Sequence, residues 1–212
     1  MDIKQAKLIL KKNFIGPDEL NSISSKLRIK KFDSKVPKIS FTASQLKKYK
    51  NNYILILGVG KHKNNSKLTL NSLCNIFGLN PNKKEPCFYN QDWYAKEDFA
   101  TKTSLNLKWY LVRKTMVSKT RGKDPEKIAY SKNQKFPTAI LCAYTFFSYY
   151  LLNNKKKLWD NDFVWCSDKD HNKDRIYIGR YTDPDSKNKS GFNVHRYLSI
   201  RSCYGMADEI TS

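Results

Sequence analysis

The stretch PTAILCAYTFFSYYLL, which runs from Pro137 to Leu152, decides the fold because it is apolar on nearly every side when it is drawn as a helix. A helix without a polar face must be surrounded by other parts of the same protein. Pro137 fits the first turn of this helix, where its missing amide costs no hydrogen bond. The apolar run from Ala139 to Leu152 is too short and too rich in tyrosine to span a bilayer. The sequence therefore predicts a central buried helix.

Three segments with the character of β-strands follow this helix. They read DFVWCS (162–167), DRIYIGRY (174–181) and FNVHRYLSI (192–200), and polar turns separate them. Alternation in the middle segment places Ile176 and Ile178 on one face and two tyrosines and a glycine on the other. We therefore expect an antiparallel sheet that packs on the central helix.

The chain before residue 137 also carries strand signals. The run YILILGVG (53–60) is typical of a buried strand that glycines end. The segment LNLKWYLVRKTMV (105–117) has the β-branched and aromatic residues of another strand. KLRIKKF (26–32) alternates like an edge strand whose lysines discourage pairing with other chains.

Two short helices are predicted from capping residues. Thr42 and Gln45 have the spacing of a capping box, and Ser66 can cap a helix that Gly78 ends. Helices that precede a terminal run of strands favour the α+β class over a parallel, doubly wound sheet. We predict a single α+β domain over residues 1–212, with a mostly antiparallel sheet, one buried central helix and smaller helices in the N-terminal half. Residues 1–40 are expected as a basic segment at its periphery.

The charge of the chain indicates a polyanionic partner. Lysine and arginine number 40 against 19 aspartates and glutamates, so the formal net charge is +21. Such a charge repels itself, and bound phosphates would compensate it. Lysine outnumbers arginine, however, which also fits an AT-rich genome and suits solvation better than bidentate recognition. A hydrophobic content of 40% excludes a disordered chain.

The cysteines indicate a reducing compartment. They are Cys74, Cys87, Cys142, Cys166 and Cys203, without a CxxC pair. An odd number without disulfide or zinc spacing is typical of reduced thiols in the cytosol. The first residues lack the long apolar core of a signal peptide. We expect a soluble cytoplasmic protein without a bound cofactor.

An acidic island interrupts this basic chain over Val164–Asn188. Its alternating members are Asp168, Asp170, Asn172 and Asp174. Oxygen ligands alternate in this way in calcium loops, but Lys173 replaces the glycine of the sharp turn and Gly179 replaces the bidentate glutamate. Aspartate and asparagine also favour turns. We interpret the island as a polar turn without an obligatory metal, with a divalent cation site as the alternative.

The sequence leaves open whether the protein is an enzyme. A metal-dependent phosphodiesterase needs acids and a lysine around phosphate. Asp168 or Asp174, with Asp185 and Lys187, supplies these residue types, although the last two lie in a loop. His195 lies on a predicted strand, and as a general base it would need an orienting acid and a substrate proton. A half-buried histidine bonded to a neighbour explains it more simply.

Basic residues interleaved with aromatic ones form the remaining signal, in KWYLVRK, SKTRGK and VHRYLSIRSCY. The predicted nucleic-acid-binding residues are Trp109, Arg113, Lys114, Lys119, Arg121, Lys123, Arg196, Tyr197 and Arg201, with Tyr110 and Tyr204 beside them. Cations that hold phosphate beside rings that stack suit single strands. An aromatic core under solvated cations would give the same pattern. We predict a nucleic-acid-binding protein; an interaction or inhibitor module for an acidic protein is a further alternative.

Overall fold

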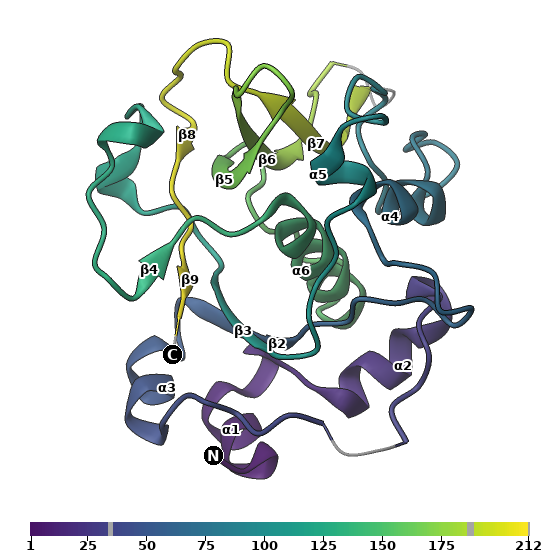
Figure 1. Ribbon diagram of the computed structural model, residues 1–212, viewed down its shortest axis with the longest axis vertical. Coiled ribbons are helices and arrows are strands. Elements are labelled where there is room, and N and C mark those ends of the chain that lie inside the picture. Colours follow the sequence, from purple (N-terminus) through teal and green to yellow (C-terminus); the bar gives the residue numbers. More distant parts are fainter. Residues whose placement is uncertain (34–35, 186–188, 212) are drawn as a thin grey trace.

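The central helix α6 (Ala139–Leu152) organises the computed structural model, which describes residues 1–33, 36–185 and 189–211 (Figure 1). All but its last two residues are buried, as the apolar circumference predicts. Thr138 caps the helix, because its hydroxyl accepts from the amide of Leu141 at 3.3 Å. The helix therefore begins two residues later than predicted, and Pro137 lies before the capping residue.

Two mixed sheets pack around α6, and Figure 1 shows the helix between them. The first sheet has the order β1-β2-β3-β9-β4. Its strands are β1 (Phe14–Ile15), β2 (Tyr53–Leu57), β3 (Trp109–Arg113), β9 (Glu209–Ile210) and β4 (Gln134–Lys135). β1 runs parallel to β2, and the other neighbours are antiparallel. Every residue of β2 is buried, which confirms the strand predicted in residues 53–60.

The second sheet contains the three strands predicted after the central helix. Its order is β7-β6-β5-β8, with β7 (Gly191–Arg196), β6 (Arg175–Tyr181), β5 (Phe163–Lys169) and β8 (Tyr204–Gly205). Only the β5–β8 pair is parallel among the described strands of this sheet. The α+β class is confirmed, but the strands form two sheets where we expected one. The C-terminal segment contributes to both sheets, because β8 pairs with β5 in the second and β9 pairs with β3 in the first.

Short helices and turns fill the N-terminal half and the β3–α6 connection. They are α1 (Ile3–Leu10), α2 (Pro17–Leu27), α3 (Ala43–Tyr49), α4 (Leu70–Phe77) and α5 (Asp98–Thr101), with 3-10 turns η1 (Lys11–Asn13), η2 (Ser118–Thr120) and η3 (Pro125–Lys127). The capping box of Thr42 and Gln45 opens α3, as predicted. Thr69 caps α4 in place of Ser66, because it directly precedes the buried face, and Gly78 ends that helix.

The edge strand predicted over residues 26–32 is wrong. Its first two residues complete α2, and Arg28 ends this helix in the left-handed region at a φ of 54°. The helix extends this far because Leu20, Ile23 and Leu27 form one buried face. Helical periodicity over the longer window therefore outweighs the short alternation. The same face places α2 in the main core.

The second sheet separates the main core from a smaller one. Ile176 and Ile178 lie in the main core with α6, whereas Tyr177 between them faces the other side. The smaller core consists of Ile128, Phe136, Phe163, Trp165, Tyr177, Tyr204 and Met206. Ile128 and Phe136 come from the connection between β3 and α6, so this connection covers part of the outer face of the sheet. The part of the face beside it is hollowed into a pocket.

Candidate functional site

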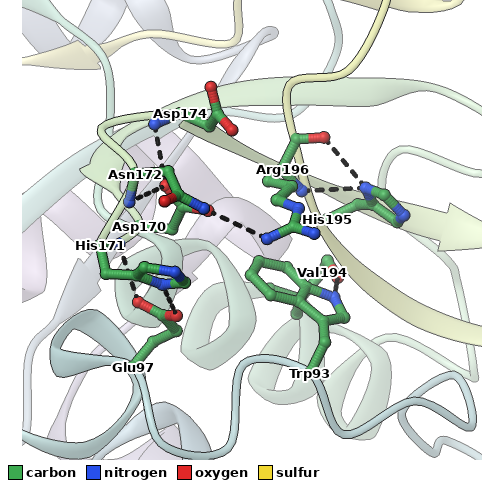
Figure 2. A network of polar contacts seen from close by, with 9 residues as sticks. All are labelled: Trp93, Glu97, Asp170, His171, Asn172, Asp174, Val194, His195 and Arg196. Atoms are coloured by element: carbon green, nitrogen blue, oxygen red, sulfur yellow. Dashed lines mark hydrogen bonds and ion pairs between the residues drawn. The ribbon is translucent and has the colours of Figure 1, made fainter.

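The middle of the acidic island, residues 170–174, forms the turn between β5 and β6 (Figure 2). Asp170 is buried, and its Oδ1 accepts from the amides of Asn172 at 3.0 Å and Asp174 at 2.8 Å. Its Oδ2 lies 3.5 Å from Nη1 of Arg196, whose guanidinium stands over the ring of Trp93. Both carboxylate oxygens therefore serve a polar turn that is tied to β7.

The tip of this hairpin is fixed against α5. The His171 amide donates to Glu97 Oε2 at 3.0 Å, and His171 Nδ1 lies 2.5 Å from Oε1 of the same side chain. Glu97 directly precedes α5, so the contact joins residues 74 positions apart in the chain. Figure 2 shows this pair beside Asp170. No local pattern in the sequence pointed to Glu97 as the partner.

Asp168, the first member of the alternation, lies outside the turn. It belongs to β5, and its Oδ2 accepts from the amide of Ala139 at 2.6 Å. This bond satisfies one of the free amides at the first turn of α6. Burial raises the pKa of Asp168, although the hydrogen bond from Ala139 acts in the opposite direction. Asp168 is thus a helix-capping acid that joins β5 to the central helix.

The acids considered for a phosphodiesterase do not meet. Asp174 directly precedes β6 and Asp185 follows its other end, and a strand of seven residues spans about 20 Å. Lys187 lies outside the described residues. Within the described parts of the chain, no group of three or more histidine, cysteine, aspartate or glutamate side chains could hold a metal ion.

Several residues predicted to bind nucleic acid lie in the interior. Trp109 is only 5% exposed, and its indole donates to a backbone carbonyl at 2.8 Å. Tyr110 is buried as well. Arg113 pairs with the fully buried Asp208, with 2.6 Å between Nε and Oδ1. The two rings are packed in the interior and the guanidinium is paired with a carboxylate. We therefore assign these three side chains to the fold and not to the surface that a nucleic-acid strand would contact.

The other predicted residues lie nearer the solvent. Lys119, Lys123 and Arg201 are exposed. Arg121 is also exposed, but both of its terminal nitrogens pair with Asp162, at 2.7 and 2.8 Å. Tyr197 is half-buried, with its ring against the indole of Trp165. Arg196 is held by Asp170 and Trp93, as described for the hairpin.

Lys114 connects two basic clefts. The first cleft has a volume of about 340 Å³ and is lined by Lys11, Lys12, Asn13 and Lys50 among others. The second has a volume of about 320 Å³ and is lined by Lys114, Lys156, Lys157, Asp160 and Asp162 among others. Lys114 Nζ donates to Asn13 Oδ1 at 3.1 Å, which joins the two clefts. Burial, and then the charges of Lys12 and Lys156, lower the pKa of Lys114.

The second cleft and the pocket on the outer face of the second sheet are lined by residues that are neighbours in the chain. Asp162 lines the cleft and pairs with Arg121, and the next residue, Phe163, lines the pocket. Arg201 also lines the pocket and has no acidic partner among the described residues. We call this set the basic track: Lys11, Lys12, Lys50, Lys114, Lys156, Lys157, Arg121 and Arg201. Asp160 and Asp162 are the only acids among the described residues that line its three hollows.

Phenylalanine and tyrosine supply five of the twelve residues that line this pocket, and we call it the aromatic pocket. Its volume is about 390 Å³. Phe163, Tyr177 and Tyr204 are its buried lining residues, and Tyr89 and Tyr181 are half-buried ones. The Tyr204 hydroxyl donates to the Tyr177 hydroxyl at 3.0 Å, and burial raises the pKa of Tyr177. The rings therefore form an uncharged surface beside the cations of the track.

His195 lines one side of the aromatic pocket. Its ring stacks on Tyr177 with 5.5 Å between centroids and an interplanar angle of 15°. Its Nδ1 lies 2.9 Å from the carbonyl oxygen and 3.0 Å from the amide of Arg196. Figure 2 shows the other ring nitrogen pointing away from these contacts. The general-base interpretation requires a carboxylate that orients the ring. No carboxylate among the described residues does so.

Sequence reasoning missed the lysines that complete the track. Lys12, Lys50 and Lys156 come from three distant parts of the chain, and no spacing links them. The run Lys155–Lys157 is visible in the sequence, but basic residues after a helix are equally explained by the helix dipole.

The chain matches no protein-family model, no curated protein sequence and no solved structure. No helix in the described ranges has both the length and the apolar character to cross a membrane.

Proposed function

We propose that this protein binds nucleic acid and that the basic track holds the phosphates of the strand. The observation that carries the proposal is the meeting of Lys12, Lys114 and Lys156 across two joined clefts. The charges of Lys12 and Lys156 are close enough to act on Lys114, and such like charges repel one another. Phosphates that lie between them would relieve the repulsion. The release of counterions from the strand adds to the binding free energy.

The track is suited to phosphates more than to base sequence. Lysine is a flexible point charge without the fixed fork that arginine offers to guanine. Arg121 is already paired with Asp162, which leaves Arg201 as an arginine on the track that can reach a ligand. Contacts of this kind fix the position of a strand and carry no sequence information. We therefore expect affinity that depends strongly on salt and weakly on sequence.

The test is charge reversal on the track, with a matched reversal elsewhere. One variant carries Lys12→Glu, Lys156→Glu and Lys157→Glu. The control variant replaces three exposed lysines outside the three hollows, Lys83, Lys96 and Lys132, with glutamate. Both variants change the net charge equally, so any difference between them reports the position of the charges.

Binding of a single-stranded oligonucleotide is measured by anisotropy over a range of salt concentrations. Each neutralised phosphate of a single strand contributes about 0.7 to the slope of log affinity against log salt. The track variant should therefore lose about 2 from this slope, whereas the control should keep it. Equal losses in both variants would refute the track, because the charge of the whole surface would then explain binding. No binding by the unaltered protein at low salt would refute the function itself.

A further inference from the structure

The aromatic pocket has the size and lining of a site for a flat ring. Its volume of about 390 Å³ falls in the range of small-molecule sites. Tyr89 and Tyr181 lie edge to face in its lining, with 5.7 Å between ring centroids. Leu198 lines the same pocket and is 68% exposed, so apolar surface is left open to solvent at its mouth. A ring in the pocket would cover this surface.

Polar groups at the side of the pocket can meet the edge of a heteroaromatic ring. Gln91 Nε2 donates to Asn193 Oδ1 at 2.6 Å and to the carbonyl of Val194. This leaves Gln91 Oε1 as an acceptor and Asn193 Nδ2 as a donor without partners among the described residues. The Nε2 of His195 is similarly unoccupied. A nucleobase presents both donors and acceptors along its edge, whereas a hydrocarbon ring presents neither.

Arg201 links the pocket to the basic track. It is exposed, it lines the pocket, and its charge is close enough to act on Tyr177. Arg121 and Arg201 are both close enough for their charges to act on Cys203, and Arg121 pairs with Asp162, which lines the second cleft. A phosphate beside Arg201 would therefore place its own base next to the aromatic pocket and the neighbouring phosphates on the track.

We infer that the aromatic pocket takes one unstacked base of a single-stranded nucleic acid. This inference rests on the proposed function, because the track delivers the strand to the pocket. A base inside a duplex is stacked and paired, and it reaches a pocket only after it is extruded. The aromatic pocket therefore makes single strands the preferred ligand class. Stacking on protein rings tolerates every base, so the preference is for an available base and not for a sequence.

The experiment compares two strands with equal phosphates. One is a single-stranded oligonucleotide, and the other is the same strand with abasic sites throughout. The track acts on both, whereas the aromatic pocket acts only on the first. The intact strand should bind about 5- to 150-fold more tightly, which corresponds to the stacking of one base. Tyr181→Ala should reduce this ratio toward one, while Tyr130→Ala, at an exposed tyrosine outside the pocket, should keep it.

Arg201→Ala is a second variant that leaves the core untouched, and it should weaken binding of both strands. Equal affinity for the intact and abasic strands would overturn the pocket and leave the proposed function standing. If neither strand binds, the proposed function fails, and a nucleoside 5′-monophosphate then tests the pocket by itself. Saturation transfer from the protein to its base protons, lost in Tyr181→Ala, would support the pocket. Absence of this transfer in the unaltered protein would overturn it.

Discussion

The contact between Arg113 and Asp208 allows a structural cation to be distinguished from a binding one. Asp208 is fully buried and accepts three hydrogen bonds: from Arg113 Nε at 2.6 Å, Tyr53 Oη at 2.7 Å and Gln134 Nε2 at 2.9 Å. Arg113 also donates from Nη2 to the Tyr53 hydroxyl at 2.6 Å. The group ties β2, β3 and β4 to the segment that enters β9.

Arg113→Ala would remove the cation and leave the carboxylate of Asp208 buried. Breaking a buried ion pair from one side costs about 3–5 kcal/mol. Tyr53 and Gln134 would still donate to Asp208, so we expect the lower end, a loss of about 3 kcal/mol in the free energy of unfolding. Asp208→Asn keeps an acceptor and leaves Arg113, which is partly exposed, able to reach water. Its expected loss is smaller, about 1–3 kcal/mol.

Urea unfolding followed by circular dichroism measures both losses, with Lys119→Ala as the control. Lys119 is an exposed cation, so its removal changes the net charge equally and should change the free energy of unfolding by less than about 0.5 kcal/mol. Arg113→Ala should bind a single strand with an unchanged salt slope under conditions where it is folded. A loss of stability below about 1 kcal/mol together with a reduced salt slope would refute the reasoning and return Arg113 to the binding surface.

Three further outcomes are expected. Phe146→Ala, in the middle of α6 and fully buried, should lower the free energy of unfolding by about 3–5 kcal/mol in the same urea assay. Asp170→Ala should lower the free energy of unfolding by about 1–3 kcal/mol. The melting temperature of the unaltered protein should be the same in millimolar calcium and in chelator. A rise of the melting temperature in calcium that Asp170→Ala abolishes would establish a metal site. Burial raises the pKa of Glu209 above its value in the unfolded chain, despite Lys135 nearby, so its preference for the protonated form stabilises the fold at low pH and is lost as pH rises through the folded pKa. The stability of the unaltered protein relative to Glu209→Gln should therefore fall as pH rises above the ordinary range of a glutamate carboxyl, and a constant difference would show that Glu209 titrates as in the unfolded chain.

Local signals predicted the elements whose cause is local. The helix over residues 139–152 is apolar on all sides, and the capping box at Thr42 is satisfied within four residues. The alternation around Ile176 correctly assigned the two faces of β6. Where two local signals competed, the weaker one misled: residues 26–32 alternate, yet the longer helical face of α2 includes the first two of them.

The candidate site was predicted only in part, because local signals do not show which residues meet at the surface. Arg201 and Tyr204 were identified from their place in a basic, aromatic segment, but the sequence could not tell that Trp109 faces the interior. Alternation gives the period of a strand and does not say which face is covered by the rest of the chain. Lys114 was identified as well, although its partners Lys12 and Lys156 were not.

The sequence by itself determined the α+β class, the central helix, three strands of the second sheet and the net charge of +21. These properties follow from period, capping and composition, which act within a few turns or residues. Only the tertiary structure decided that the strands form two sheets, that His171 meets Glu97 and that Lys12, Lys114 and Lys156 surround joined clefts. Such meetings depend on how the whole core packs, and a surface lysine carries no periodic signal because solvent tolerates it at almost any exposed position.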